Sequence, residues 1–444
     1  METTVEKSKN FDVKSLEKTV EDLYDFKNYY FLNHSIEYAV NIYSDVKKKL
    51  EDTLVELKSI EEEAVKNDRA YYLYLMGKAY NVEEEYNIKA EDYLSKAVKL
   101  NPNLINAWNH LGDSYFKKGE YAEAKNCFLN ALNKEKNKVS LRNLSVVLRK
   151  EHVKTKDEMI NNVDLGLKYA QEALELDPND GTSWYIMGNA FISSFFTIKQ
   201  SAKTLMQAMD AYNRAEDDKI SKNNPDLFYN KAVALKFQEK YEEALQYFDK
   251  AFAFDPQWKA VKLLQENLLK YLSSIQDLIN LKGRVKNKKL QNLIKSINVE
   301  KHLNPFDKLS EDKNKGDVKL CHVPLSQLKI GLNEDKVILG VVVCSVQNEE
   351  LVPFTFCIVD KESTCVAVTT YNLANGQGVI IGDVVAVAMP FLKEINFIIK
   401  DKQFQFKSVR VSNPVLMSVN GKLLPANKMS SMQMSTFSEA DNKI

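Results

Sequence analysis

The residues of this chain that could do chemistry are polar side chains suited to binding rather than to bond breaking. Arg149 could hold a ligand carboxylate through its paired N–H donors, and Asp226 could hold an amine or a guanidinium. Asparagine donates and accepts at once, so a row of asparagines suits the backbone of an extended peptide. The spacing predicts these peptide-binding positions: Asn109, Asp113, Arg142, Arg149, Asn189, Asp226 and Asn230. Each could instead be solvated or paired within its own domain.

A second group of candidate residues is basic. The stretch from Lys282 to Lys295 carries six basic residues and no acidic one. Such a block could contact RNA phosphates, with an affinity that falls as salt rises. A solvated linker or a nuclear import signal would have the same composition. The candidate contacts are Arg284, Lys286, Lys288 and Lys289.

An enzyme needs a constellation that this sequence does not contain. It has no Walker loop, no GxGxxG after a strand, no GxSxG and no HExxH. The five histidines are scattered, and the neighbours Cys321 and His322 would point to opposite faces of a strand. The five cysteines include no CxxC pair, which argues against a disulfide framework or a zinc site. We therefore predict no enzymatic activity, no cofactor or metal, and buried thiols in a reducing compartment.

Length and charge limit the remaining classes. At 444 residues the chain is long enough for two or three domains. Lys plus Arg and Asp plus Glu are each 61, so no net charge draws the whole protein to nucleic acid or an anionic membrane. The longest apolar run, Val337 to Cys344, is shorter than a membrane span, and the N-terminus is charged from Glu2. We expect neither secretion nor membrane insertion.

The elements that must position the candidate residues are helical repeats. The stretch from Ala107 to Tyr115, followed by Ala124, Phe128 and Ala131, fits the 34-residue tetratricopeptide pattern. Gly112 stands at the small-residue position of this pattern. Gly77 stands at the same position one period earlier, and Ser145 stands there one period later. Two looser units follow, with insertions expected at 154–161 and 198–205. Such an array offers a concave groove for a peptide or a helix. Trp108, Trp184 and Trp258 could stack on a ligand, but their signature positions favour core packing.

The C-terminal part is β. Short blocks of Val, Ile, Phe and Thr predict strands, separated by turn residues, at 318–321, 337–346, 354–359, 364–370, 384–389, 395–399 and 404–411. This spacing suits an OB-type barrel with accessory strands. Residues 318–420 hold as many acidic as basic residues, which favours a protein-docking barrel over a reader of single-stranded nucleic acid.

The fold class we predict is an α-solenoid of tetratricopeptide repeats followed by an OB-fold-like β-barrel. The expected boundaries are a helical cap over 1–69, the array with its C-terminal capping helix over 70–281, and a basic connector over 282–316, whose last part is a flexible joint. The barrel follows over 317–420, and a disordered tail over 421–444.

Several segments outside the generic repeat positions carry a family resemblance. They include Leu94 to Leu100, Asn137 to Leu141, Ser183 to Tyr185, Asn224 to Leu227, Lys288 to Gln291, Val352 to Phe356 and Ser408 to Val411. On these the chain resembles the tetratricopeptide-repeat protein 5 family, also described as stress-responsive activators of a histone acetyltransferase coactivator. The resembling segments are spread over nearly the full length.

The resemblance implies a specific role. Family members recognise the N-terminal Met-Arg-Glu peptide of nascent tubulin at the ribosome and recruit a deadenylase complex through an adaptor, so that tubulin mRNA decays. Arg149 matches the arginine that would pair with the peptide Glu, and Asp226 the aspartate that would take a positive group. Lys286 and Lys288 match the lysines that face the ribosome. Lys259 stands where family members can carry an acidic residue, which would weaken that side of the site.

The family is also described in other roles, and these supply the alternative function. One is a nuclear scaffold that joins a histone acetyltransferase coactivator to its cofactors during stress and DNA damage, with DNA or chromatin association. Another is restraint of an actin-nucleating cofactor. The resemblance therefore implies both a cytoplasmic and a nuclear location, and no membrane partner.

Overall fold

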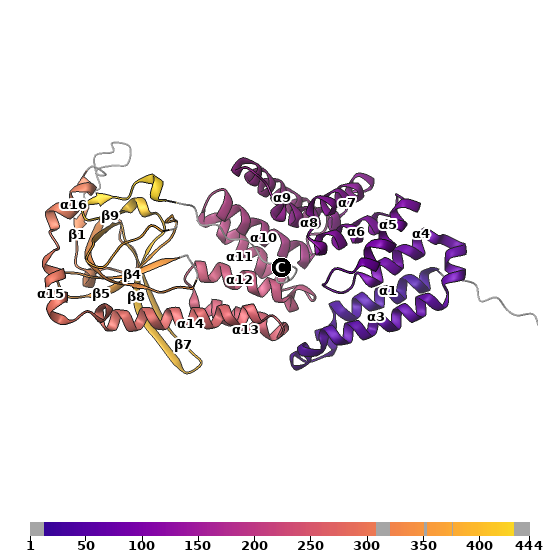
Figure 1. Ribbon diagram of the computed structural model, residues 1–444, viewed down its shortest axis with the longest axis horizontal. Helices are drawn as coiled ribbons and strands as arrows, with labels where there is room; N and C mark the ends of the chain where they lie inside the picture. Colours follow the sequence, from indigo (N-terminus) through magenta and orange to yellow (C-terminus); the bar gives the residue numbers. More distant parts are fainter. Residues whose placement is uncertain (1–12, 308–319, 350–352, 375, 430–444) are drawn as a thin grey trace, which may run out of the picture. The chain divides into compact units, whose positions relative to one another are not determined.

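The computed structural model describes residues 13–307, 320–349, 353–374 and 376–429 (Figure 1). These residues divide into two compact units, one ending at Val261 and one beginning at Lys262. The first unit is helical, and the second is built mainly of strands. The predicted fold class is confirmed: tetratricopeptide helices are followed by a curled β-sheet of the OB type.

The first unit begins with helices that precede the repeats. They are α1 (Val13–Asn28), α2 (Tyr30–Asn33), the 3-10 helix η1 (Ile36–Asn41) and α3 (Ile42–Ser59). The next helix, α4 (Glu61–Tyr80), is interrupted at Asp68, whose backbone leaves the helical region at φ −147° and ψ 94°. The Asp68 carboxylate accepts a hydrogen bond from the Tyr71 N–H at 2.9 Å, so a fresh helical segment starts there.

Helices pack in antiparallel pairs from α4 onward, as α4/α5, α6/α7, α8/α9, α10/α11 and α12/α13. Their bounds are α5 (Ile88–Leu100), α6 (Ile105–Lys118), α7 (Tyr121–Lys134), α8 (Lys138–Lys150), α9 (Lys156–Leu176), α10 (Gly181–Thr197), α11 (Ala202–Glu216), α12 (Pro225–Phe237) and α13 (Tyr241–Phe254), with the 3-10 turn η2 (Ser221–Asn223) before α12. The small-residue slots explain the pairing. A Cβ at Gly112 would lie 2.5 Å from the Phe128 ring, and one at Gly77 would lie 2.5 Å from Leu94.

The two expected insertions are not loops. Helix α9 already starts at Lys156, because Thr155 and Glu158 form a capping box that begins the helix early. Helix α10 continues to Thr197, and α11 starts at Ala202. The extra residues at these two places mainly lengthen α9 and α10, and helix α9 starts earlier than a delayed second helix would.

The second unit contains helix α14 (Lys259–Asn280) from Lys262 onward. The Tyr271 hydroxyl lies 2.6 Å from Thr355 Oγ1, and the Gln276 side chain accepts from the Gln405 N–H at 2.6 Å. We predicted this helix as the C-terminal cap of the array. The two hydrogen bonds join it to strands β4 and β8, and it belongs to the sheet unit from Lys262 onward.

The expected connector is ordered up to Asp307. It forms η3 (Lys282–Arg284), α15 (Asn287–Lys295) and α16 (Val299–Asp307), and it buries Leu290 and Ile294 against the sheet unit. Its apolar residues, spaced one helical turn apart, turn a basic segment into a packed amphipathic helix. The flexible joint expected over 301–316 is thus helical as far as Asp307, and residues 308–316 lie outside the described residues.

The sheet runs in the order β10-β9-β6-β3-β4-β5-β8-β7-β2, with β1 pairing β3. The strands are β1 (Cys321–His322), β2 (Gly331–Leu332), β3 (Lys336–Val346), β4 (Phe354–Val359), β5 (Cys365–Thr370), β6 (Val384–Ala388), β7 (Phe391–Ile399), β8 (Lys402–Val411), β9 (Met417–Val419) and β10 (Lys422–Leu423); the 3-10 turns are η4 (Leu325–Gln327), η5 (Pro414–Leu416) and η6 (Ala426–Lys428). Most pairs are antiparallel, but β5 with β8 and β1 with β3 are parallel. Part of the predicted tail is therefore a strand, and residues 430–444 lie outside the described residues.

Candidate functional site

The candidate site lies on α8, α10 and α12, the first helices of three repeat pairs in the first unit (Figure 1). In such arrays the first helices line a concave groove. Arg149 is in the last turn of α8, where its Nη1 donates to Ser145 Oγ at 2.7 Å. Burial lowers the pKa of Arg149 to about 10, although Tyr185 and Tyr212 oppose this shift. Among the described residues no carboxylate forms an ion pair with Arg149. This guanidinium is thus largely desolvated and lacks the anion that usually accompanies such a group.

Tyr185 links Arg149 to Asp226 electrostatically. Burial first, and then the negative charge of Asp226, raise the pKa of the Tyr185 hydroxyl well above its usual value, whereas Arg149 acts in the opposite direction. One cation and one anion therefore act on the same buried ring. Arg149 and Asp226, which the sequence predicted separately, thus lie near one buried tyrosine.

Two predicted asparagines hold the aromatic wall of this site. Asn189 accepts a hydrogen bond from the Tyr212 hydroxyl at 2.7 Å, and Asn230 donates to the Tyr185 hydroxyl at 3.3 Å. Both asparagines are buried. They therefore orient the tyrosines that surround Arg149. The tyrosines themselves carry no signal in the sequence that separates them from ordinary core aromatics.

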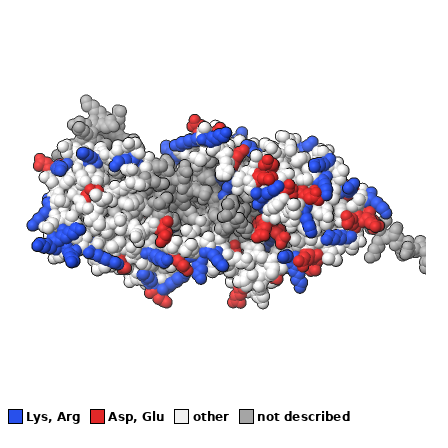
Figure 2. Space-filling model, in the orientation of Figure 1, with Lys and Arg blue, Asp and Glu red and all other residues white. Residues whose placement is uncertain are grey.

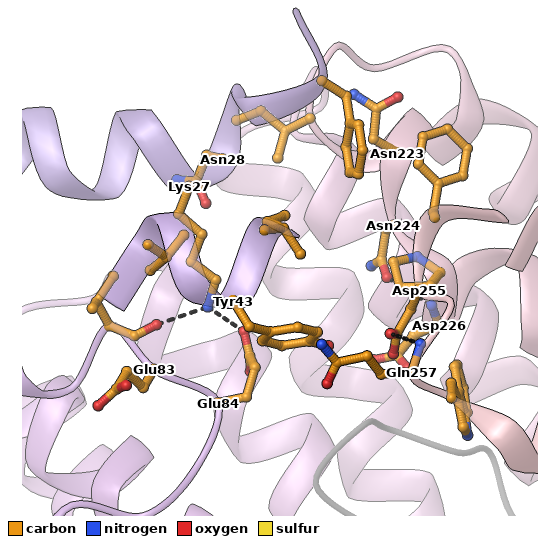
Figure 3. A pocket seen from close by; sticks show the side chains of 18 of the residues that line it. Lys27, Asn28, Tyr43, Glu83, Glu84, Asn223, Asn224, Asp226, Asp255 and Gln257 are labelled. Carbon is orange, nitrogen blue, oxygen red and sulfur yellow. Dashed lines mark hydrogen bonds and ion pairs between the residues drawn. The ribbon is translucent and has the colours of Figure 1, made fainter. Parts of the chain in front are cut away.

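Asp226 lies in the first turn of α12, after the N-cap Asn224, whose side chain accepts from the Asp226 N–H at 2.9 Å. It lines a cavity of about 1060 Å³ together with Asn223, Asp255 and Gln257 (Figure 3). The cavity is large enough for several residues of an extended peptide.

The opposite wall of this cavity comes from the N-terminal helices, which the sequence did not predict. Lys27 and Tyr43 project into it from α1 and α3 (Figure 3). Lys27 pairs with Glu84 and donates to the Val82 carbonyl at 2.8 Å. Phe31 meets Phe254 of α13 edge to face, with ring centroids 5.0 Å apart. The segment before the repeats thus contacts the last repeat and forms one wall of this cavity.

Three other predicted residues are engaged within the array. Arg142 pairs with Asp180 at 2.6 Å. Asn109 accepts from Ser140 Oγ at 2.7 Å. Asp113 pairs with Lys117 at 2.9 Å and accepts from the Asn81 amide at 2.8 Å. These contacts mostly join neighbouring repeats, and the binding role predicted for the three residues stays a prediction.

The basic candidates are in the second unit and face solvent. Arg284, Lys286, Lys288 and Lys289 are exposed on η3 and the start of α15. Figure 2 shows Lys and Arg side chains gathered over this end of the second unit, at the left of the view. The apolar side of α15 is buried, so the helix presents its basic side outward. This arrangement can make several phosphate contacts at once.

Comparison with known proteins assigns the family. Residues 319–433 match the model of the tetratricopeptide repeat protein 5 OB fold domain, and residues 105–138 and 225–257 match tetratricopeptide repeat models. Tetratricopeptide repeat protein 5 of Homo sapiens is 43% identical over 92% of this chain and 93% of its own length. The chain belongs to the tetratricopeptide repeat protein 5 family.

Further relatives agree with this assignment. The protein of the same name from Mus musculus is 42% identical over 94% of both chains, and that from Bos taurus is 42% identical over 92% of this chain and 93% of its own. Membership in the family and its repeat fold indicate a protein that acts through protein partners. In the described part of the chain, no helix has the length and apolar character needed to cross a membrane.

Proposed function

We propose that the groove of this protein binds the N-terminal peptide of nascent tubulin at the ribosome, as an adaptor that promotes tubulin mRNA decay through a deadenylase complex. The observation that carries the proposal is the desolvated Arg149, which has no carboxylate partner among the described residues and shares an aromatic wall with Asp226. A ligand carboxylate would supply the anion that Arg149 lacks among the described residues.

The Met-Arg-Glu sequence has the required chemistry. Its glutamate can accept two parallel hydrogen bonds from a guanidinium, and its arginine can donate to a carboxylate. Arg149 would take the first and Asp226 the second. The cavity beside Asp226 gives room for the neighbouring residues of the peptide. The protein acts here as a reader of a peptide and not as an enzyme.

The basic residues of η3 and α15 supply the second part of the proposal. They lie in a different unit from the groove and are exposed, so they can contact ribosomal RNA while the groove holds the peptide. Such contacts weaken as salt rises, because each releases counterions from the phosphates. Peptide recognition and ribosome association should therefore be separable.

The peptide arm is tested by fluorescence anisotropy with a labelled Met-Arg-Glu-Ile peptide. Loss of one partner of a desolvated charge pair costs about 2–5 kcal/mol, so Arg149→Ala should weaken binding at least about 30-fold. The exposed Arg69→Ala is the matched control and should bind like wild type. Wild type and Arg149→Ala should bind a peptide with Gln in place of Glu with the same affinity. No binding by folded wild-type protein would overturn the peptide arm and favour the coactivator-scaffold alternative.

The ribosome arm is tested by cosedimentation. Lys286→Glu with Lys288→Glu should reduce the fraction of protein that pellets with ribosomes while leaving peptide affinity unchanged. The exposed pair Lys99→Glu with Lys203→Glu makes the same charge change elsewhere and should leave pelleting intact. Equal losses in both double variants would mean a nonspecific charge effect.

A further inference from the structure

A row of cysteines lies on one face of the sheet in the second unit. Cys344 of β3 is directly opposite Cys357 of β4. Cys365 of β5 is opposite Val359, two residues from Cys357 along β4. Paired residues of neighbouring strands point to the same face, so the three thiols share one side of the sheet.

A β-bulge creates this row. Before the bulge, Val341 pairs with Val359 and Val342 with Ile358; after it, Cys344 pairs with Cys357. Without the extra residue, Val343 would be opposite Cys357, and Cys344 would point to the other face. Bulges are specific local features rather than random irregularities. Here the bulge places two sulfur atoms against each other.

The cysteines differ in how well their spacing suits a disulfide. Directly opposed residues have Cα atoms about 4.5–5.5 Å apart, whereas diagonal neighbours are about 7–8 Å apart. A disulfide needs a Cα separation of about 4.4–6.8 Å. The pair Cys344 and Cys357 meets this requirement, and the diagonal pair Cys357 and Cys365 does not.

The thiols also differ in acidity. The hydrogen bond from Cys357 holds the pKa of the Cys344 thiol below its usual value, against the effect of burial. The pKa of Cys357 is raised, first by Cys344, then by Cys365, and then by burial. Cys344 is also the more accessible of the two to a small oxidant, and the thiolate is the reactive form. Its side chain is nearly buried, at 7% exposed, and that of Cys357 is fully buried.

We propose that Cys344 and Cys357 are a peroxide-sensitive thiol pair that closes to a cross-strand disulfide. The Cys344 thiolate attacks hydrogen peroxide, which yields a sulfenic acid and, after proton uptake, one water. The Cys357 thiol then attacks the sulfenic sulfur, so that the S–S bond forms and a second water leaves. The two thiols lose two electrons and two protons in total, and one peroxide is reduced to two waters.

A disulfide between Cys344 and Cys357 would lie close to contacts that the sheet makes with neighbouring elements. Thr355 is two residues from Cys357 on the same strand, and its side chain forms a hydrogen bond with Tyr271 of α14. The backbone at Gly283 packs against the bulge residue Val343, and a Cβ at Gly283 would lie 2.8 Å from the Val343 carbonyl oxygen. Formation of the disulfide would thus change the sheet directly beneath the segment that carries Arg284 and Lys286.

The test is disulfide mapping on the full chain. Reduced wild-type protein is treated with hydrogen peroxide, blocked with an alkylating agent under denaturing conditions, digested without reductant and analysed by mass spectrometry. We expect a peptide joining Cys344 to Cys357, 2 Da lighter than the sum of the two free peptides. Cys357→Ser should remove it and leave a sulfenic acid on Cys344 that dimedone traps, whereas Cys127→Ser should change nothing.

Two results would overturn the proposal. One is full alkylation of Cys344 and Cys357 at a peroxide dose that oxidises the exposed Cys321, which would mean that the pair is inert packing. The other is a disulfide from Cys357 to Cys365 instead, which would show that the opposed register does not decide the chemistry. The wild-type map alone decides between these results, whether or not the serine variants fold.

Discussion

Gly188 lies against the ring of Tyr212, so closely that a Cβ at this position would be 2.4 Å from Tyr212 Cε1. Helices α10 and α11 meet at this point, and the same ring donates its hydroxyl hydrogen bond to Asn189. The small residue that permits the helix pair to pack also fixes one wall of the Arg149 site. Repeat packing and ligand recognition thus share one contact.

Gly188→Ala should therefore affect both properties. The added methyl group must displace a fully buried ring, and overpacking of this kind costs about 1–3 kcal/mol in the free energy of unfolding. We expect a lower urea midpoint and weaker binding of Met-Arg-Glu-Ile. In a Tyr212→Leu background the same change should cost less, because the ring is gone. An equal cost in both backgrounds would assign the effect to helix propensity alone.

Arg149 and Arg142 of the same helix should respond in opposite ways to replacement by methionine. Arg149→Met removes a desolvated charge that lacks a carboxylate partner, so it should raise the free energy of unfolding by about 1 kcal/mol while abolishing peptide binding. Arg142→Met leaves the half-buried Asp180 without its 2.6 Å partner and should lower stability by about 2 kcal/mol. Urea denaturation of both variants measures the contrast, and destabilisation by Arg149→Met would contradict it.

Glu216 should make stability depend on pH. Burial alone would raise the pKa of Glu216, but hydrogen bonds from Lys231 and Lys250 outweigh it and hold that pKa below 4.5. A carboxyl group with a lowered folded-state pKa contributes stability that is present above its unfolded value and is lost as pH falls through the folded value. The stabilisation should therefore be complete at pH 7 and decline below about pH 4.5.

The matching substitution is Glu216→Gln, which leaves the buried Lys231 without its ion pair at 2.5 Å. We expect a loss of about 2 kcal/mol at pH 7, measured by urea denaturation. The difference from wild type should shrink at pH 3.5, where the wild-type carboxylate begins to take up a proton. A difference that does not change with pH would mean that the amide disturbs packing and that the charge is unimportant.

Gly283→Ala should loosen the attachment of the basic segment to the sheet. Gly283 has φ +68°, and a Cβ there would approach the Val343 carbonyl oxygen at 2.8 Å. We expect faster amide hydrogen exchange in α15 and a loss of about 2 kcal/mol in stability. Gly331→Ala is the matched control, since Gly331 also has positive φ but nothing within 4 Å of its Cβ position. The same loss in both variants would point to backbone conformation and not to the contact.

The sequence predicted the parts of the molecule that follow local patterns. Gly112 and Phe128 stand at fixed repeat positions, and their contact forms as the pattern requires. The main strands were found within a few residues, because alternating β-branched residues between turn residues mark them. Arg149 and Asp226 were predicted as site residues because their types and spacing suit a groove, and their role in binding stays a prediction.

The parts that depend on distant contacts could not be predicted. The cavity wall from Lys27 and Tyr43 exists because the N-terminal helices contact the last repeat, which no local pattern indicates. The bulge at Val343 has no signature in an apolar run of this kind. The basic segment looked like a linker because its buried residues, Leu290 and Ile294, are few beside its charges.

The contact between Phe31 and Phe254 also constrains how the first unit folds. A repeat array can grow by adding one helix pair to the next, since each pair contacts mainly its neighbours. The N-terminal helices are synthesised first, yet their partner on α13 is made only after all the repeats between them. Closing this contact carries the entropy cost of a long loop, and it is available only once the intervening pairs have packed. The cavity lined by both segments should therefore remain open on the growing chain and be completed as the last step of folding.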